Sequence, residues 1–187
     1  MARSPPLQVA ASAGVGASPR DFDAIFAQEF SYVWRTLGRL GIREPDREDL
    51  ANEVFFQVYR RLPTFDFERP LRPWLFAFAF RIASGHRRLA RNRFEQSVEL
   101  SEVVDGAPCA DESMERRESQ ELVDRGLESL ELDQRAVFVL FEIDGCAMPE
   151  IATALAIPLN TGYSRLRLAR ARFAATVRRI KLQQGES

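Results

Sequence analysis

The chain has 187 residues, a formal net charge of −1, 45% hydrophobic residues and 28% charged residues. This composition is typical of a globular protein with one domain or two small ones, and no apolar run approaches the length of a membrane span. The one histidine, His86, and the two cysteines, Cys109 and Cys146, lack metal-ligand spacing, so we expect neither a metal site nor a cofactor.

Residues 1–19 are rich in Ala, Ser, Pro and Gly and lack the continuous apolar core of a signal peptide. We expect them to form a disordered leader. The two isolated cysteines are expected to be reduced thiols, which predicts a cytoplasmic protein.

Three helices are expected in the first half of the chain. Apolar residues recur at helical spacing over residues 21–41 and again over residues 47–62, where Asp46 is the expected N-cap. A loop with three prolines follows at residues 63–73. The third helix is expected over residues 74–92, apolar at first and strongly basic at its end.

Charge is distributed unevenly along this nearly neutral chain. Residues 69–94 contain seven arginines and no acidic residue, whereas residues 95–124 contain ten acidic residues and two arginines. Gly106, Ala107 and Pro108 interrupt any helix in the acidic stretch. The pattern predicts two basic modules separated by an acidic tether.

Four further helices are expected, over residues 112–129, 134–143, 149–157 and 161–180. Asp133 and Asn160 are the expected N-caps of the second and the last of these. We find no alternating strand pattern anywhere. The fold class is therefore predicted to be all-α, with two small helical domains joined by a flexible acidic linker.

The last two expected helices form a helix-turn-helix pattern. The final helix carries seven basic residues and no acidic residue on its outer face: Arg165, Arg167, Arg170, Arg172, Arg178, Arg179 and Lys181. An ordinary helical hairpin with solvated arginines is the simpler alternative. We favour a DNA recognition helix, because contact with phosphates requires an unbalanced basic face.

Taken together, these segments resemble a known protein family. Residues 46–66, followed by Trp74 and Leu75 at the start of an arginine-rich helix, resemble region 2 of bacterial sigma factors. Residues 126–138, followed by the helix-turn-helix, resemble region 4. There is no room for region 1 or for a folded region 3, so the resemblance is to the extracytoplasmic-function (ECF) group of the sigma-70 family.

The resemblance implies a domain organisation and a function. Region 2 would span residues 20–94, the acidic linker 95–117 and region 4 residues 118–182, with 183–187 as a tail. The chain would be an alternative sigma factor that binds core RNA polymerase, directs it to promoters and promotes DNA opening. Chemistry would belong to the polymerase, so the chain is not expected to be an enzyme.

The implied partners are the clamp coiled coil of the largest polymerase subunit, the polymerase flap, promoter DNA and an anti-sigma factor. Neither a small-molecule substrate nor membrane insertion is expected. Core polymerase would be bound by the exposed face of the second helix, with Asp49, Asn52, Glu53, Phe56 and Arg60. An exposed aromatic among charges is typical of such a surface.

The minus-ten promoter element would be read and opened by the proline-rich loop and the third helix. The predicted contacts are Phe65, Asp66, Phe67, Arg69, Arg81, His86, Arg87, Arg88 and Arg91, with Arg93 on the same phosphate track. Aromatic rings can hold an unstacked base, and arginines can follow the freed strand.

The minus-thirty-five element would be read by the recognition helix, through Thr161, Tyr163, Ser164, Arg165, Arg167, Arg170 and Arg172. Gly162 and Tyr163 stand where Val and Lys are common in the family, and Ala147 replaces the usual Ser cap. Glycine inside a helix lowers helix stability by on the order of 1 kcal/mol. The helix that begins near Ala147 is expected to fray.

Two other functions compete with this interpretation. A dimeric helix-turn-helix regulator that does not bind polymerase would explain the C-terminal module but leave residues 46–93 without a role. An adaptor or anti-sigma protein that never touches DNA conflicts with the arginine-rich tract in each half. An enzyme is least favoured, because the sequence has no phosphate-binding loop and no paired nucleophile and base.

Overall fold

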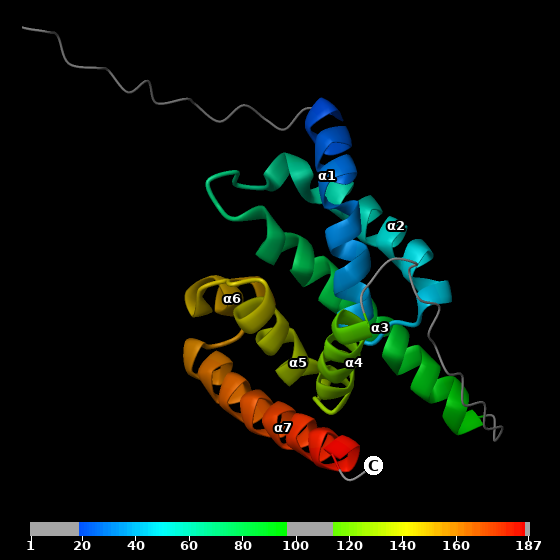
Figure 1. Cartoon of the computed structure of the whole chain (residues 1–187). Helices are drawn as coiled ribbons and strands as arrows, with labels where there is room; N and C mark the ends of the chain where they lie inside the picture. Colours follow the sequence, from blue (N-terminus) through cyan, green and yellow to red (C-terminus); the bar gives the residue numbers. More distant parts are fainter. Residues whose placement is uncertain (1–18, 97–113, 186–187) are drawn as a thin grey trace, which may run out of the picture.

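The computed structural model of the protein describes residues 19–96 and 114–185, and all regular structure in these ranges is helical (Figure 1). The helices are α1 (Pro19–Arg39), α2 (Glu44–Arg61), α3 (Leu71–Gln96), α4 (Met114–Glu128), α5 (Leu132–Phe138), α6 (Met148–Leu155) and α7 (Leu159–Gly185). A short 3-10 helix, η1 (Leu62–Thr64), follows α2, and a π-helical turn, η2 (Val139–Ile143), extends α5. The all-α prediction is confirmed.

Helices α1, α2 and α3 form the N-terminal half, in which α1 packs on both other helices. Val33 and Leu37 of α1 are completely buried, as are Leu40, which directly follows α1, and Val54 and Val58 of α2. These residues recur every three or four positions, so each helix presents one apolar face to the core. The sequence pattern correctly predicted this packing.

The starts of α2 and α3 differ from the prediction, and proline is the reason in both helices. Arg43, not Asp46, is the N-cap of α2, and Pro45 lies in its first turn. Asp46 is inside the helix, where its carboxylate accepts a hydrogen bond from Arg43 at 3.3 Å. Helix α3 begins three residues early, with Pro73 in its first turn. First-turn N–H groups have no helical partner, so proline loses nothing there.

Helices α4 to α7 form the C-terminal half, in which α5 and α4 pack against α7. The ring of Phe138 stacks on Phe173, with centroids 4.7 Å apart and an interplanar angle of 25°. Leu166 and Ala169 of α7 are buried, as predicted. Both predicted caps are wrong here: Glu131 is the N-cap of α5, and α7 begins before Asn160.

The helix-turn-helix consists of α6 and α7, and its turn has specific backbone features. The N–H of Ala147 donates a hydrogen bond to the Glu150 carboxylate at 2.9 Å, which caps α6 without a serine. Ala156 closes α6 in the left-handed conformation, with φ of 54°. A Cβ on Gly162 would lie 2.6 Å from Met148 Sδ, so glycine leaves room for this side chain where α6 and α7 approach each other.

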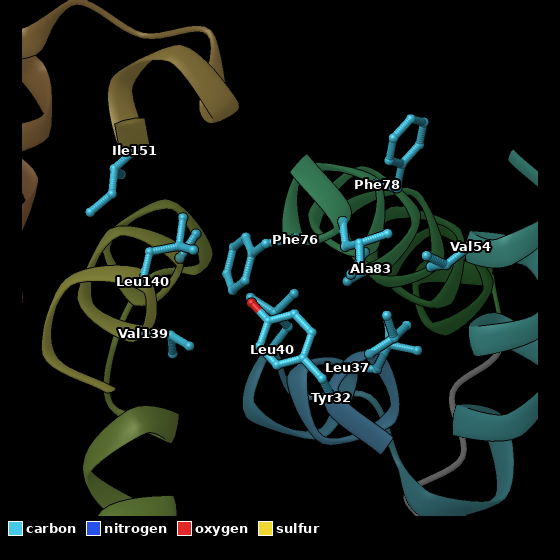
Figure 2. Close-up of a cluster of buried hydrophobic side chains, with 14 of the residues drawn as sticks. Tyr32, Leu37, Leu40, Val54, Phe76, Phe78, Ala83, Val139, Leu140 and Ile151 are labelled. Carbon is cyan, nitrogen blue, oxygen red and sulfur yellow. The ribbon is translucent and has the colours of Figure 1, made fainter. Parts of the chain in front are cut away.

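The two halves are in contact and share one hydrophobic core. Helix α6 packs beside α3 (Figure 1). Phe76 of α3 points toward Leu140 of η2, next to Tyr32 of α1 and Leu40, which follows α1 (Figure 2). The sequence pattern did not predict this contact.

A buried arginine also lies between the halves. Arg135 is 3% exposed and donates hydrogen bonds to the carbonyls of Glu128, the last residue of α4, and Leu130, which follows it. Burial, and then the nearby positive charge of Arg87, lowers the pKa of Arg135 to about 10. Gly41, with φ of 86°, leaves room for its guanidinium, because a Cβ there would lie 2.7 Å from Nη1.

The predicted leader and most of the predicted linker lie outside the described residues, and the domain boundaries stay predictions. Helix α3 extends to Gln96 and α4 begins at Met114. In the ranges that the structure describes, no helix is long and apolar enough to cross a membrane. In the same ranges, no cluster of His, Cys, Asp and Glu could hold a metal ion.

Candidate polymerase and promoter-binding surfaces

The predicted polymerase contacts lie together on one exposed face of α2: Asp49, Asn52, Glu53, Phe56 and Arg60. Phe56 is 58% exposed, whereas the preceding residue, Phe55, is 1% exposed. The Arg60 guanidinium lies 5.9 Å from the centroid of the Phe56 ring. This face therefore presents an uncovered aromatic ring surrounded by charges of both signs.

The loop between η1 and α3, residues 65–70, is called here the minus-ten loop, and it is built on an aromatic cluster. The Phe65 ring lies 4.3 Å from Trp74 and 5.1 Å from Phe67, measured between centroids. Phe67 is 52% exposed, and Trp74 also contacts Phe78 at 4.9 Å. Trp74 is half-buried and packs against the hydrophobic core. Its ring also lies directly against the predicted base-capturing Phe65.

The charged side chains of the minus-ten loop hold its turn. The Nε of Arg69 lies 3.6 Å from the Asp66 carboxylate, which also accepts a hydrogen bond from the Glu68 N–H at 3.1 Å. Both members of the ion pair are largely exposed. They remain accessible to a ligand beside the aromatic cluster.

Two of the predicted phosphate contacts on α3, Arg81 and Arg88, are exposed. They are seven residues apart and so lie on the same side of the helix. The Arg81 guanidinium lies 5.3 Å from the Phe78 ring, which continues the aromatic cluster. The side chains of Arg91 and Arg93 lie outside the described residues.

The other two predicted contacts on α3, His86 and Arg87, are half-buried, and Arg87 lies near Arg135 of the other half. His86 Nε2 lies 3.8 Å from the carboxylate of Asp46 in α2. Arg87 donates a hydrogen bond of 3.4 Å to the carbonyl of Leu40 at the end of α1. Their roles in DNA binding stay predictions.

The start of α7 presents a polar surface to solvent. Tyr163 is 52% exposed, and Ser164 and Arg167 are exposed, while Thr161 is half-buried. The Ser164 hydroxyl donates to the Asn160 carbonyl at 2.9 Å. Tyr163 and Arg167 are four residues apart, so their side chains lie on one face, available to the same groove.

The three other predicted arginines of α7 form ion pairs with acids from the preceding segments: Arg165 with Asp133 at 2.6 Å, Arg170 with Glu142 at 2.6 Å and Arg172 with Glu131 at 3.7 Å. Acidic residues from outside α7 therefore neutralise part of its basic face. The sequence of α7 alone did not indicate this, because the acids come from other segments. Exposed ion pairs stabilise a fold by only about 0–1 kcal/mol. DNA phosphates can therefore displace these acids from the arginines.

Comparison with known proteins assigns the two halves separately. The family model for Sigma-70 region 2 matches residues 25–93, and that for Sigma-70 region 4 matches residues 120–173. Together they include α2, the minus-ten loop, most of α3, α6 and the first part of α7. Every described surface above lies inside one of these two matches.

Three sigma factors illustrate the sequence similarity. NccH of Alcaligenes xylosoxydans xylosoxydans is 27% identical over 72% of this chain and 75% of its own length. CnrH of Cupriavidus metallidurans is 26% identical over 90% of this chain and 92% of its own length. The ECF RNA polymerase sigma-E factor of Escherichia coli is 29% identical over 67% of this chain and 70% of its own length.

Solved structures share the fold. The sigma factor RpoE of Bartonella quintana, in complex with the anti-sigma factor NepR, superimposes with a TM-score of 0.72 and 20% identity, over 85% of this chain and 98% of that one. CnrH, in complex with the cytosolic domain of CnrY, superimposes with a TM-score of 0.59 and 24% identity, over 91% of this chain and 92% of that one. The chain belongs to the sigma-70 family, in its ECF group, and is an alternative sigma factor that directs RNA polymerase to promoters.

Proposed function

We propose that the chain carries out promoter recognition with three separate surfaces. The outer face of α2 binds the clamp coiled coil of core RNA polymerase, the minus-ten loop with α3 opens the promoter, and the start of α7 reads the upstream element. The observation that carries this proposal is the exposure of Phe56 among charged residues. An uncovered aromatic surrounded by charges is typical of a binding surface rather than of a solvated face.

The minus-ten loop has the side chains that strand capture requires. An unstacked base needs a flat aromatic partner, which the exposed ring of Phe67 and the adjoining Phe65–Trp74 pair supply. The freed strand needs positive charge beside that pocket, which Arg69 and Arg81 supply. This arrangement supports DNA opening at the loop rather than at the helix-turn-helix.

The start of α7 supports base reading in a major groove. Among the described arginines from 165 to 172, Arg167 is the one without an ion pair, and Tyr163 lies beside it. Thr161, Ser164 and Arg165 flank them, while Arg170 and Arg172 lie farther along the helix, where they fit phosphates.

The remaining partners follow from the same assignment. The sigma factor RpoE of Bartonella quintana is bound by the anti-sigma factor NepR in its solved structure, which supports an anti-sigma factor as a partner of this chain. Region 4 would contact the polymerase flap. We place the protein in the cytoplasm with the polymerase, which performs the chemistry while this chain performs none.

Charge reversal on α2 tests the polymerase surface. The double variant Asp49→Arg/Glu53→Arg should bind core polymerase at least tenfold more weakly, because it removes two acids from the proposed interface. Glu48→Arg is the matched control, since Glu48 is exposed on another side of α2 and should have little effect. Pull-down titrations measure the affinities, and circular dichroism checks the helical content. Equal affinity of parent and double variant would remove this face from the interface.

A further inference from the structure

Two arginines of α7 form the same kind of ion pair at different places along the helix. Arg165 Nη2 lies 2.6 Å from Asp133 Oδ2, and Arg170 Nε lies 2.6 Å from Glu142 Oε1. Each arginine donates a charge-assisted hydrogen bond in its pair, which is among the stronger hydrogen bonds in proteins. The two pairs match in chemistry and length, so a difference in their effect on DNA binding must come from their position.

Arg165 lies in the turn of α7 that carries the predicted base contacts. Ser164 and Tyr163 directly precede it, and both are exposed. The side chain of Arg165 is 27% exposed, whereas that of Asp133 is 53% exposed. The arginine is therefore restricted by its surroundings, and a DNA group that approaches it also meets the carboxylate.

Asp133 is held beside Arg165 by the packing of α5 on α7. It lies in the first turn of α5, where the positive end of the helix dipole favours a carboxylate. Phe138, the last residue of α5, stacks on Phe173 of α7 with ring centroids 4.7 Å apart. A DNA complex that keeps this packing therefore keeps the carboxylate next to the arginine.

Arg170 lies more than one helical turn beyond Arg165 and is contacted by two adjacent residues of η2. Its Nε pairs with Glu142, and its guanidinium lies 5.3 Å from the centroid of the Phe141 ring. Its side chain is 55% exposed, about twice the exposed fraction of Arg165. This position is assigned to phosphates under the proposed function, and phosphate contacts carry no direct sequence information.

A carboxylate next to an arginine changes which DNA group that arginine prefers. A phosphate carries a negative charge that the carboxylate repels, whereas a guanine edge offers the arginine two neutral acceptors, O6 and N7. An arginine whose charge is balanced by Asp133 keeps N–H donors for such an edge but attracts phosphate less. Nonspecific DNA binding depends almost entirely on phosphates, so this effect weakens it more than binding at a matching sequence.

We propose that Asp133 is a specificity-determining residue for the upstream promoter element: it orients Arg165 and balances its charge, so that this arginine reads a base edge instead of holding a phosphate. Asp133 acts through Arg165 and needs no contact with DNA itself. The inference deepens the proposed function, on which it rests, because it assigns discrimination to a residue outside the recognition helix.

Two variants that remove only a charge test the inference, Asp133→Asn and its matched control Glu142→Gln. Each is assembled as the full chain with core polymerase. The probes are a promoter duplex on which the parent starts transcription and the same duplex with its upstream element scrambled. Fluorescence anisotropy measures the affinity for each duplex over a range of salt concentrations, and thermal unfolding of the free chain checks that the fold is intact.

Asp133→Asn should raise the affinity for the scrambled duplex by about three- to tenfold and leave the affinity for the promoter unchanged or lower, because Arg165 becomes able to hold a phosphate. One added phosphate contact should also steepen the salt dependence on the scrambled duplex, by about 0.9 in the slope of log affinity against log salt. Glu142→Gln should change both affinities by a similar factor, so the ratio between the two duplexes should stay within about twofold of the parent.

An unchanged ratio for Asp133→Asn would overturn the inference. An equal loss of affinity for both duplexes, together with a lower unfolding temperature, would overturn it as well, because that result indicates a structural role. If the parent holoenzyme did not distinguish the two duplexes, the proposed function of α7 would fail first. The salt slope on the scrambled duplex would then still decide whether Asp133 keeps Arg165 from phosphates.

Discussion

A glycine near the start of the recognition helix illustrates how packing overrides helix propensity. Gly162 lowers the stability of α7 because glycine has a low helix propensity. A Cβ at this position, however, would lie 2.6 Å from Met148 Sδ. Met148 is 2% exposed, so a shift of its side chain must displace neighbouring core side chains. The sequence identified the glycine as a departure from the family, but the reason for it lies in the approach of α6 to α7.

We expect Gly162→Ala to destabilise the fold by about 1–3 kcal/mol, because the added methyl overpacks the helix-turn-helix. Gly85→Ala is the matched control, since a Cβ at Gly85 of α3 meets nothing within 4 Å. It should stabilise the fold by roughly 0.5–1 kcal/mol through helix propensity alone. Urea unfolding measures both changes, and a stabilising Gly162→Ala would contradict the packing argument.

At the scale of elements, hydrophobic periodicity predicted which segments are helical, but not where the helices begin. Core positions such as Val54, Val58 and Leu166 repeat over several turns, so many residues support each assignment. A helix start depends on one or two residues. Asp46 was expected to cap the second helix and Pro73 to belong to the loop before the third, whereas Pro45 and Pro73 both lie in first turns.

The minus-ten loop is the element whose function can be separated from simple DNA affinity. Phe65→Ala and Phe67→Ala should leave binding to duplex DNA within about twofold of the parent, because intact duplex offers no unstacked base. Both variants should impair promoter opening, scored by permanganate reactivity of thymines on a linear promoter with polymerase present. Leu89→Ala, which removes an exposed apolar side chain of α3, is the control. Opening at parental levels by both phenylalanine variants would exclude the loop as the strand-capturing element.

At the scale of the whole molecule, the sequence predicted two modules but not the contact between them. The side chains of Tyr32 and Asp144 form a hydrogen bond between the halves, yet the two residues are 112 positions apart and neither belongs to a repeating pattern that marks a partner. The ion pairs of Arg165 and Arg170 were missed for the same reason, since their acids lie on other segments. The exposed face of α2 could be predicted, because one helix alone determines which of its residues face outward.

The central claim is that this chain brings core polymerase to defined promoters through both halves. The direct test is run-off transcription on genomic DNA fragments with purified core polymerase, with and without the protein, followed by mapping of the 5′ ends. We expect a discrete set of starts that requires the protein and shares two upstream sequence elements. Arg167→Ala should reduce transcription from these starts by roughly 10- to 100-fold, because loss of a base contact weakens the free energy of DNA binding by about 1–3 kcal/mol. An identical set of starts without the protein, or starts that do not change with Arg167→Ala, would contradict the account.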